Sequence, residues 1–209
     1  PESVQAIGRA GSGVNNIPID KLSELAIPVF NAPGANANAV KELALAAILI
    51  AARNIHRAMD YIHNLKRSDN LKSDIESVKK QYIGYELPNK TLGIIGLGSI
   101  GVKVANAGYD LGMKVLGFDP MITVDNAINL VPGVKKYNDL NEVLKNVDIL
   151  SIHIPYTNET KDFISENEIN LMKNKKQEFK RVSLNYIKKL EVGFYQNTKE
   201  LLVGHQKNL

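Results

Sequence analysis

Apolar and polar residues follow a regular pattern between residues 91 and 155. Short apolar runs rich in β-branched residues predict buried strands, and stretches with an apolar residue every three or four positions predict helices. The predicted strands are Thr91 to Ile95, Lys114 to Phe118, Gly133 to Tyr137 and Asp148 to Ile154, and the predicted helices are Ile100 to Leu111 and Asp139 to Asn146. Strands that alternate with helices at this spacing predict an α/β fold with a doubly wound parallel sheet.

A second strand–helix–strand unit precedes this region. Val4 to Arg9 and Ile27 to Phe30 have the pattern of short buried strands, and Ala10 to Asn16 forms a turn of glycine and asparagine. Pro18 suits the first turn of a helix that would run to about Leu25, because the missing N–H of proline costs nothing there. The unit predicts two parallel strands joined by a crossover helix.

Asn38 opens a long helix that is apolar on more than one face. One predicted face holds Leu43, Ala46, Ala47, Ile50 and Ala51, but Leu45, Ile48 and Leu49 are apolar as well. Because a helix that is apolar nearly all round is buried on several sides, we expect it between two domains or in a subunit interface. The periodicity weakens toward Leu65, and the charged residues 66–80 predict an exposed connector.

The composition is that of a globular protein. Of the 209 residues, 44% are hydrophobic and 23% are charged, which argues against a disordered or fibrous chain. The absence of cysteine excludes disulfides, thiolate metal ligands and a cysteine nucleophile. The longest apolar run, Leu43 to Ala52, is far shorter than the ~20 residues that cross a bilayer, and no signal-peptide pattern opens the chain. We therefore expect no membrane association and a cytoplasmic location.

The basic sequence pI of about 9.1 comes from one end of the chain. Residues 171–209 hold nine basic and three acidic residues, which leaves 17 of the 26 basic and 19 of the 22 acidic residues to residues 1–170. Such a segment is either a solvated tail or a nucleic-acid-binding arm. Since no interleaving of aromatic and basic residues supports the arm, we expect no nucleic-acid partner.

The histidines give no pattern of a metal site. His56 and His63 fall in the long helical region, and we expect both on a polar helix face. No two histidines stand four positions apart with a carboxylate between them. The sequence therefore predicts no metal.

Gly96, Gly98 and Gly101 fit the G-x-G-x-x-G pattern of dinucleotide-binding loops. The pattern follows a predicted strand and opens a predicted helix, which is the context that it requires. Gly96 permits a tight turn, Gly98 lets the backbone approach a pyrophosphate, and Gly101 lets the helix pack closely on its strand. Backbone N–H groups at the start of the helix would face the anion.

An acidic residue, Asp119, ends the next predicted strand about 20 residues later. Its carboxylate can accept hydrogen bonds from the ribose hydroxyls of NAD and would repel the 2′-phosphate of NADP, so NAD is the expected cofactor. The alternative is a glycine turn in an α/β protein that binds no nucleotide, with Asp119 as a turn residue before Pro120.

These segments resemble a known family. The run from Thr91 to Gly101 resembles the cofactor loop of the D-isomer-specific 2-hydroxyacid dehydrogenases, and Gly8 to Asn16 resembles their substrate-side loop. Asn31 to Leu43 is especially similar to the short-type D-3-phosphoglycerate dehydrogenases of this family. His153-Ile154-Pro155 resembles the segment over the adenosine half of the cofactor. The resemblance extends from Val4 to about residue 173.

The resemblance implies a fold and a domain order. The fold is a Rossmann-like NAD-binding domain beside a flavodoxin-like substrate domain. Residues 1–40 would be a partial substrate domain, 41–88 an interdomain helix and connector, 89–192 the NAD-binding domain, and 193–209 a degraded C-terminal segment.

The resemblance also implies a set of contacts. The implied cofactor contacts are Ser12, Gly96, Gly98, Ser99, Ile100, Gly101, Asp119, His153, Ile154 and Pro155. The implied substrate contacts are Arg9, Gly11 and Gly13, whose loop would present backbone N–H groups to the carboxylate of a 2-hydroxy or 2-oxo acid. A surface ion pair is an equal alternative for Arg9.

The pattern departs from the family after Lys173. Lys188 stands where the family has its substrate-binding arginine, and lysine lacks the planar bidentate fork of arginine. Gly193 stands where the family has an aspartate near the nicotinamide, and Glu200 is out of register with the glutamate that orients the catalytic histidine. We expect His205 to be an ordinary surface residue, the chain to begin at a fragment boundary, and its end to precede the catalytic histidine motif.

Three functions stay open on the sequence. The first is NAD-dependent hydride transfer on a 2-hydroxy acid, with 3-phosphoglycerate of serine biosynthesis as the expected substrate and with turnover impaired by the incomplete Arg/Glu/His set. The second is a non-catalytic NAD-binding or interaction module. The third is a truncated or frameshifted reading frame without function. The resemblance also implies a homodimer, which the apolar helix over Leu43 to Ala52 allows.

Overall fold

A four-stranded parallel sheet forms the centre of the chain. The computed structural model describes residues 3–14, 16–65, 71–157 and 159–172. The strands, in the order β5-β4-β3-β6, are all parallel. They are β3 (Thr91–Ile95), β4 (Lys114–Phe118), β5 (Lys135–Tyr137) and β6 (Ile149–Ile152), joined by α5 (Ser99–Asp110), α6 (Val124–Ile128) and α7 (Leu140–Asn146) and followed by α8 (Glu166–Leu171). This architecture confirms the predicted doubly wound α/β fold.

The strand order creates a switch point at β3. The chain passes from β3 to β4 and β5 on one side, and then returns so that β6 pairs with the other side of β3. In open α/β sheets, ligands bind at the carboxyl ends of the strands where the strand order reverses in this way. Gly96 directly follows β3 and His153 directly follows β6, so both lie at this edge.

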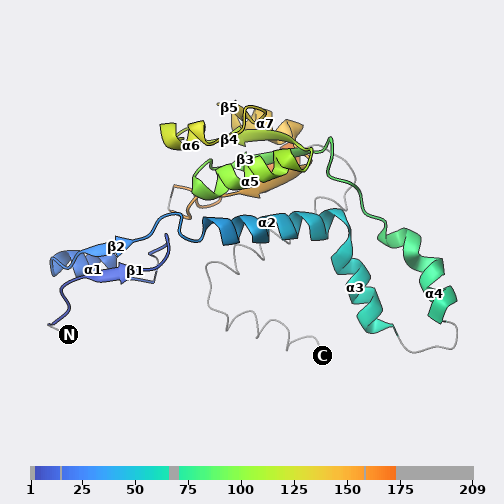
Figure 1. Cartoon of the computed structure of the whole chain (residues 1–209), viewed down its shortest axis with the longest axis horizontal. Helices are drawn as coiled ribbons and strands as arrows, with labels where there is room; N and C mark the ends of the chain where they lie inside the picture. Colours follow the sequence, from blue (N-terminus) through green and yellow to red (C-terminus); the bar gives the residue numbers. More distant parts are fainter. Residues whose placement is uncertain (1–2, 15, 66–70, 158, 173–209) are drawn as a thin grey trace.

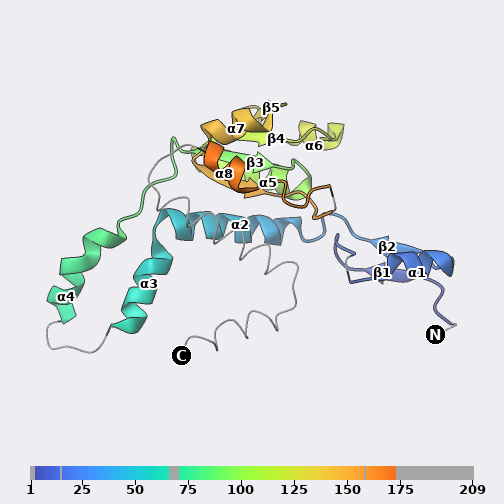
Figure 2. The ribbon, with the colours of Figure 1, turned by 180° about the vertical axis from the view of Figure 1, so that it is seen from behind.

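Each face of the sheet is covered by a hydrophobic core. On one face, the strands pack against α5 and α2 (Ala37–Ala52), with Leu92, Ile94 and Val104 fully buried. On the other face, Ile95 and Leu116 pack against α7. Alternate side chains of β3 thus point to opposite faces, and all five residues of this strand are buried. Figures 1 and 2 show these layers from opposite sides.

α2 is covered on one face only by the described residues. Ile48 and Ala52 are buried in the core that α2 shares with α5, whereas Leu43 and Leu49 are 49% and 40% exposed. Of the residues that the sequence places on one face of this helix, Leu43 and Ala46 are exposed, and Ala47, Ile50 and Ala51 are half-buried. Within the described part of the chain, α2 is not buried on several sides as expected, because α5 packs only against the side that includes Ile48.

Two further helices leave the far end of α2. Asn54, in the left-handed region with φ 54°, ends the run, and α3 (Ile55–Asn64) continues in a new direction. α4 (Leu71–Val78) and a 3₁₀ turn (Lys79–Tyr82) lead back to the sheet. The expected exposed connector at 66–80 thus contains a helix at residues 71–78, and most of the residues described there are exposed. Figure 1 shows α3 and α4 projecting beyond the sheet.

A smaller parallel sheet lies at the opposite end of α2 (Figure 1). It pairs β1 (Ile7–Arg9) with β2 (Val29–Asn31), and α1 (Ile19–Glu24) connects them. The predicted strand–helix–strand unit is confirmed, with shorter strands than the sequence indicated. The expected burial of these strands is not met among the described residues, since Phe30 is 64% exposed. Among the helices that the structure describes, none is long and apolar enough to cross a membrane.

Candidate cofactor-binding site

Gly96 makes the tight turn between β3 and α5. Its φ of 86° lies in the left-handed region, which favours glycine. A Cβ added at Gly96 would lie 2.7 Å from the carbonyl oxygen of His153 and 2.9 Å from Cγ2 of Ile154. Both the backbone conformation and the close approach of the chain after β6 therefore require glycine here.

The other two glycines of the loop have different surroundings. A Cβ at Gly101 would overlap the carbonyl oxygen of Gly96, so Gly101 allows α5 to begin directly against the turn. Gly98 has an ordinary φ of −75°, and a Cβ there would meet no described protein atom within 4 Å. Neither backbone strain nor packing within the described chain requires glycine at position 98. A ligand that approaches the backbone, such as a pyrophosphate, gives a physical reason for it.

The first turn of α5 is open to an anion. Gly98 is the N-cap residue, and in the described part of the chain no side chain caps this helix. The first N–H groups of a helix have no intrahelical partner and carry the positive end of the helix dipole. Ser99 is exposed, Gly98 and Ile100 are half-buried, and a Cβ at Gly98 would have open space around it, so the backbone of this turn can be reached from outside. These residues fit a bound diphosphate.

Asp119 points toward the glycine loop. Its Oδ2 accepts a hydrogen bond from the backbone N–H of Leu97 (2.7 Å), and its Oδ1 accepts one from the N–H of Met121 (2.8 Å). The carboxylate is half-buried. Because each carboxylate oxygen can accept more than one hydrogen bond, Asp119 can hold the loop and still receive a ribose hydroxyl.

The segment after β6 covers the turn from the other side. The backbone N–H of His153 donates to the carbonyl of Ile95 (2.7 Å), and Nε2 of His153 shares a hydrogen bond of 2.8 Å with Oγ of Ser151. Burial lowers the pKa of His153 to about 4, because desolvation disfavours the charged imidazolium. The ring is therefore neutral at pH 7. Oγ1 of Thr160 donates to the carbonyl of Pro155 (2.6 Å) and closes the following turn.

The substrate-side loop lies next to β2. Gly11 is buried with φ 140°, while Ser12 and Gly13 are exposed. Nε of Arg9 donates to Oδ1 of Asn16 at 3.4 Å, a long hydrogen bond to a neutral amide. Nδ2 of Asn31 donates to the carbonyl of Ser12 at 2.8 Å.

Gly34 brings this region to the cofactor loop. Gly34 has φ 81°, and a Cβ added to it would lie 3.6 Å from Cβ of Ser99. Residues 31–34 therefore contact the substrate-side loop and lie close to the start of α5. The sequence patterns gave Asn31 and Gly34 no role in the site, although both lie in the segment from Asn31 to Leu43 that resembles the family. Their position, at the end of a predicted strand and in a Pro-Gly turn, was a further signal.

Some predicted site residues lie outside the described residues. They are Lys188, at the position of the family arginine, and Gly193, Glu200 and His205, which mark the departures from the family. Their roles stay predictions.

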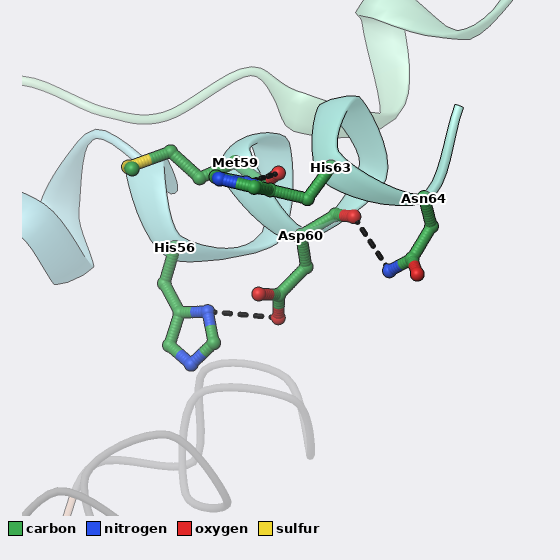
Figure 3. A network of polar contacts seen from close by, with 5 residues as sticks. All are labelled: His56, Met59, Asp60, His63 and Asn64. Carbon is green, nitrogen blue, oxygen red and sulfur yellow. Dashed lines mark hydrogen bonds and ion pairs between the residues drawn. The ribbon is translucent and has the colours of Figure 1, made fainter. Parts of the chain in front are cut away.

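The two histidines of α3 each contact a near neighbour on the same helix (Figure 3). Nδ1 of His56 lies 2.9 Å from Oδ2 of Asp60, and Nδ1 of His63 lies 2.9 Å from the carbonyl oxygen of Met59. Both histidines are exposed, as expected for a polar helix face. Among the described residues, no three His, Cys, Asp or Glu side chains are placed to hold a metal ion.

The switch point, the glycine turn, the open start of α5 and the acid after β4 together define a dinucleotide-binding domain of the Rossmann type. Residues 45–177, more than half of the chain, match the family model described as the NAD binding domain of D-isomer specific 2-hydroxyacid dehydrogenase. The chain belongs to this family, and the cofactor of the matched domain is NAD.

Individual relatives agree with this assignment. The chain is 40% identical over 172 residues to a D-3-phosphoglycerate dehydrogenase of Methanocaldococcus jannaschii, a match that covers 82% of this chain and 30% of the relative. It is 36% identical over 173 residues to a hydroxypyruvate reductase of Thermotoga maritima, covering 83% of this chain and 51% of the relative. The chain thus spans about half or less of the curated relatives that it matches.

A solved structure has the same fold. D-lactate dehydrogenase from Aquifex aeolicus, complexed with NAD and lactic acid, superposes with a TM-score of 0.64 at 31% identity. The match covers 81% of this chain and 47% of that one. The described chain therefore has the fold of part of a dehydrogenase that has been crystallised with NAD.

Proposed function

We propose that this chain is the cofactor-binding part of an NAD-dependent 2-hydroxyacid dehydrogenase whose substrate is 3-phosphoglycerate. The 40% identity to a D-3-phosphoglycerate dehydrogenase supports the substrate. The observation that carries the cofactor site is Gly98, a glycine that neither its φ nor its neighbours within 4 Å require. It lies at the start of α5, where an anion is favoured.

The proposed roles follow from the geometry of the site. NAD, when bound, accepts a hydride from the carbon that bears the hydroxyl group. Backbone N–H groups of residues 98–101 would bind the pyrophosphate, and Asp119 would bind the ribose. Ser12 and the residues after β6, His153 to Pro155, would line the cofactor. The loop from Arg9 to Gly13 would bind the substrate carboxylate.

Calorimetric titration with NAD tests the cofactor site. We expect Gly98→Val to weaken NAD binding at least tenfold, because the valine side chain would occupy the space that the pyrophosphate needs. Gly8→Val is the matched control, since a Cβ at Gly8 also meets no described atom within 4 Å but lies in β1. Wild-type affinity in Gly98→Val, or equal losses in both variants, would contradict the proposal.

A second candidate is an NAD-binding module with little or no turnover. Lys188 favours it, since a lysine at the position of the family arginine cannot form two parallel hydrogen bonds to a carboxylate. NADH formation with 3-phosphoglycerate separates the two candidates. If Lys188 impairs an enzyme, Lys188→Arg should raise the rate; NAD binding without turnover in either form would favour the module.

A homodimer is also part of this proposal. The face of α2 that no described residue covers exposes Leu43 and Leu49, and α3 exposes Met59 (51%) and Ile62 (61%). A second copy of the chain would cover this apolar surface. A cytoplasmic location and a place in serine biosynthesis stay predictions.

A further inference from the structure

Residues 31 and 32 donate hydrogen bonds to two consecutive carbonyls of the substrate-side loop. Nδ2 of Asn31 donates to the carbonyl of Ser12 at 2.8 Å, and the backbone N–H of Ala32 donates to the carbonyl of Gly11 at 3.0 Å. Both distances are typical of good hydrogen bonds. The loop between β1 and α1 is therefore fixed from the end of β2.

These two bonds also set the direction of two N–H groups. The described peptide bonds are trans, and in a trans peptide the C=O and the following N–H point in opposite directions. Since the Gly11 and Ser12 carbonyls face Ala32 and Asn31, the N–H groups of Ser12 and Gly13 face away from β2. Two successive N–H groups on one side of a loop form a concave site for an anion.

The backbone of the loop does not by itself fix this arrangement. Gly11 has φ 140°, and glycine there leaves the loop many conformations. Ser12 and Gly13 are exposed, so side-chain packing restrains them little. Asn31 is the last residue of β2 and pairs in register with Arg9, which places its amide beside the loop that Arg9 begins.

We propose that Asn31 is a positioning residue, which holds the Ser12–Gly13 peptide so that its N–H faces the carboxylate of the substrate acid. This inference rests on the proposed function, because that function supplies the acid. Among the described hydrogen bonds, the side chain of Asn31 makes none to the cofactor loop; its partner is Ser12. Its removal should thus weaken acid binding and leave NAD binding unchanged.

Calorimetry on the whole chain with NAD and with 3-phosphoglycerate tests the inference. Asn31→Asp keeps the size of the side chain but, when ionised, cannot donate to the Ser12 carbonyl. We expect about tenfold weaker 3-phosphoglycerate binding in Asn31→Asp and Asn31→Ala at pH 7.5, with NAD affinity unchanged. Asn38→Ala is the matched control, because Asn38 contacts only Lys41 and Glu42 on α2 in the hydrogen bonds described.

The pH dependence of the Asn31→Asp variant separates positioning from a general loss of structure. Once the introduced carboxyl group is protonated, it regains one O–H donor. Because the ordinary pKa of aspartate is about 3.9, the deficit of Asn31→Asp should therefore shrink between pH 7.5 and pH 4, while that of Asn31→Ala should not. A constant deficit in both variants, accompanied by lower resistance to urea, would overturn the inference.

The two proposals fail in different ways. No NAD binding by the wild-type chain refutes the cofactor site, while a selective loss of acid binding in Asn31→Asp would still support Asn31. Acid binding in Asn31→Asp equal to wild type, or no acid binding by the wild-type chain, overturns the inference even when NAD binds.

Discussion

At the scale of single residues, glycine is needed at the three loop positions for different reasons. Gly96 is needed by its φ of 86° and Gly101 by the neighbouring carbonyl oxygen of Gly96, so both serve the fold. Gly98 is required by neither. Asp119 serves the loop through the Leu97 N–H and has acceptor capacity left over. Of these features, Gly98 and the remaining acceptor capacity of Asp119 indicate a bound ligand.

The buried His153 makes stability depend on pH. Its folded pKa of about 4 lies below the ordinary value of 6.5, so the unfolded chain binds the proton more tightly and stability falls as the pH drops below about 6.5. A shift of this size corresponds to roughly 2 kcal/mol lost between pH 7 and pH 5. Urea unfolding at both pH values measures it.

Two histidine variants provide the comparison for this measurement. His153→Gln carries no titrating group and should lose less stability than wild type over the same pH range. His63→Gln, on the exposed surface of α3, should behave like wild type. An equal pH dependence in all three proteins would mean that His153 is not the group responsible.

The residues of the glycine loop could be predicted from the sequence, but the residues that lie against the site loops could not. The loop glycines and Asp119 could be identified because their positions follow from the strand pattern and from a fixed spacing. Gly34 lies close to Ser99, 65 positions further along the chain, and the bond from Asn31 to Ser12 joins the end of β2 to the loop after β1. Such neighbours depend on how separate elements are placed in space, which no local pattern encodes.

At the scale of elements, Asn106 ties α5 to the chain before β5. Its Nδ2 donates to the carbonyl of Asn129 (2.8 Å), and its Oδ1 accepts from the N–H of Val131 (3.0 Å). We expect Asn106→Ala to lower the free energy of unfolding by about 2 kcal/mol, because two backbone groups lose their partner. Denaturant unfolding measures this loss.

A neighbouring asparagine is the control for that prediction. Nδ2 of Asn129 donates only to the carbonyl of Asp125 on its own exposed helix, as far as the described bonds go, so Asn129→Ala should cost a few tenths of a kcal/mol. Equal losses in the two variants would show that the bridge from α5 contributes little.

Element boundaries were predictable where the pattern was simple. β3 and β4 begin and end at the predicted residues, because short apolar runs bounded by glycine or aspartate leave little freedom. α4 was not predicted, because Ile75 and Val78, which have helical spacing, stand among charged and polar residues. The face of α2 that α5 covers was not predicted, since a helix that is apolar nearly all round does not specify which side is covered.

At the scale of the whole molecule, the uncovered side of α2 predicts self-association. We expect the double variant Leu43→Glu/Leu49→Glu to be monomeric in light scattering under conditions where wild type is dimeric, because two buried charges would disrupt the apolar contact. Val124→Glu on α6, also highly exposed at 74%, should leave the dimer intact. A wild-type monomer, or a dimer in the double variant, would contradict the prediction.

Gly34, between the smaller sheet and α2, lies close to Ser99 at the start of α5. Residues 32–36 connect the smaller sheet to α2, and Gly34 in this connection lies beside the first turn of α5. If the smaller sheet rotated about the end of α2, Gly34 would move relative to Ser99. The expected diphosphate site would then change shape. A diphosphate bound at the start of α5 would in turn restrict this rotation of the smaller sheet.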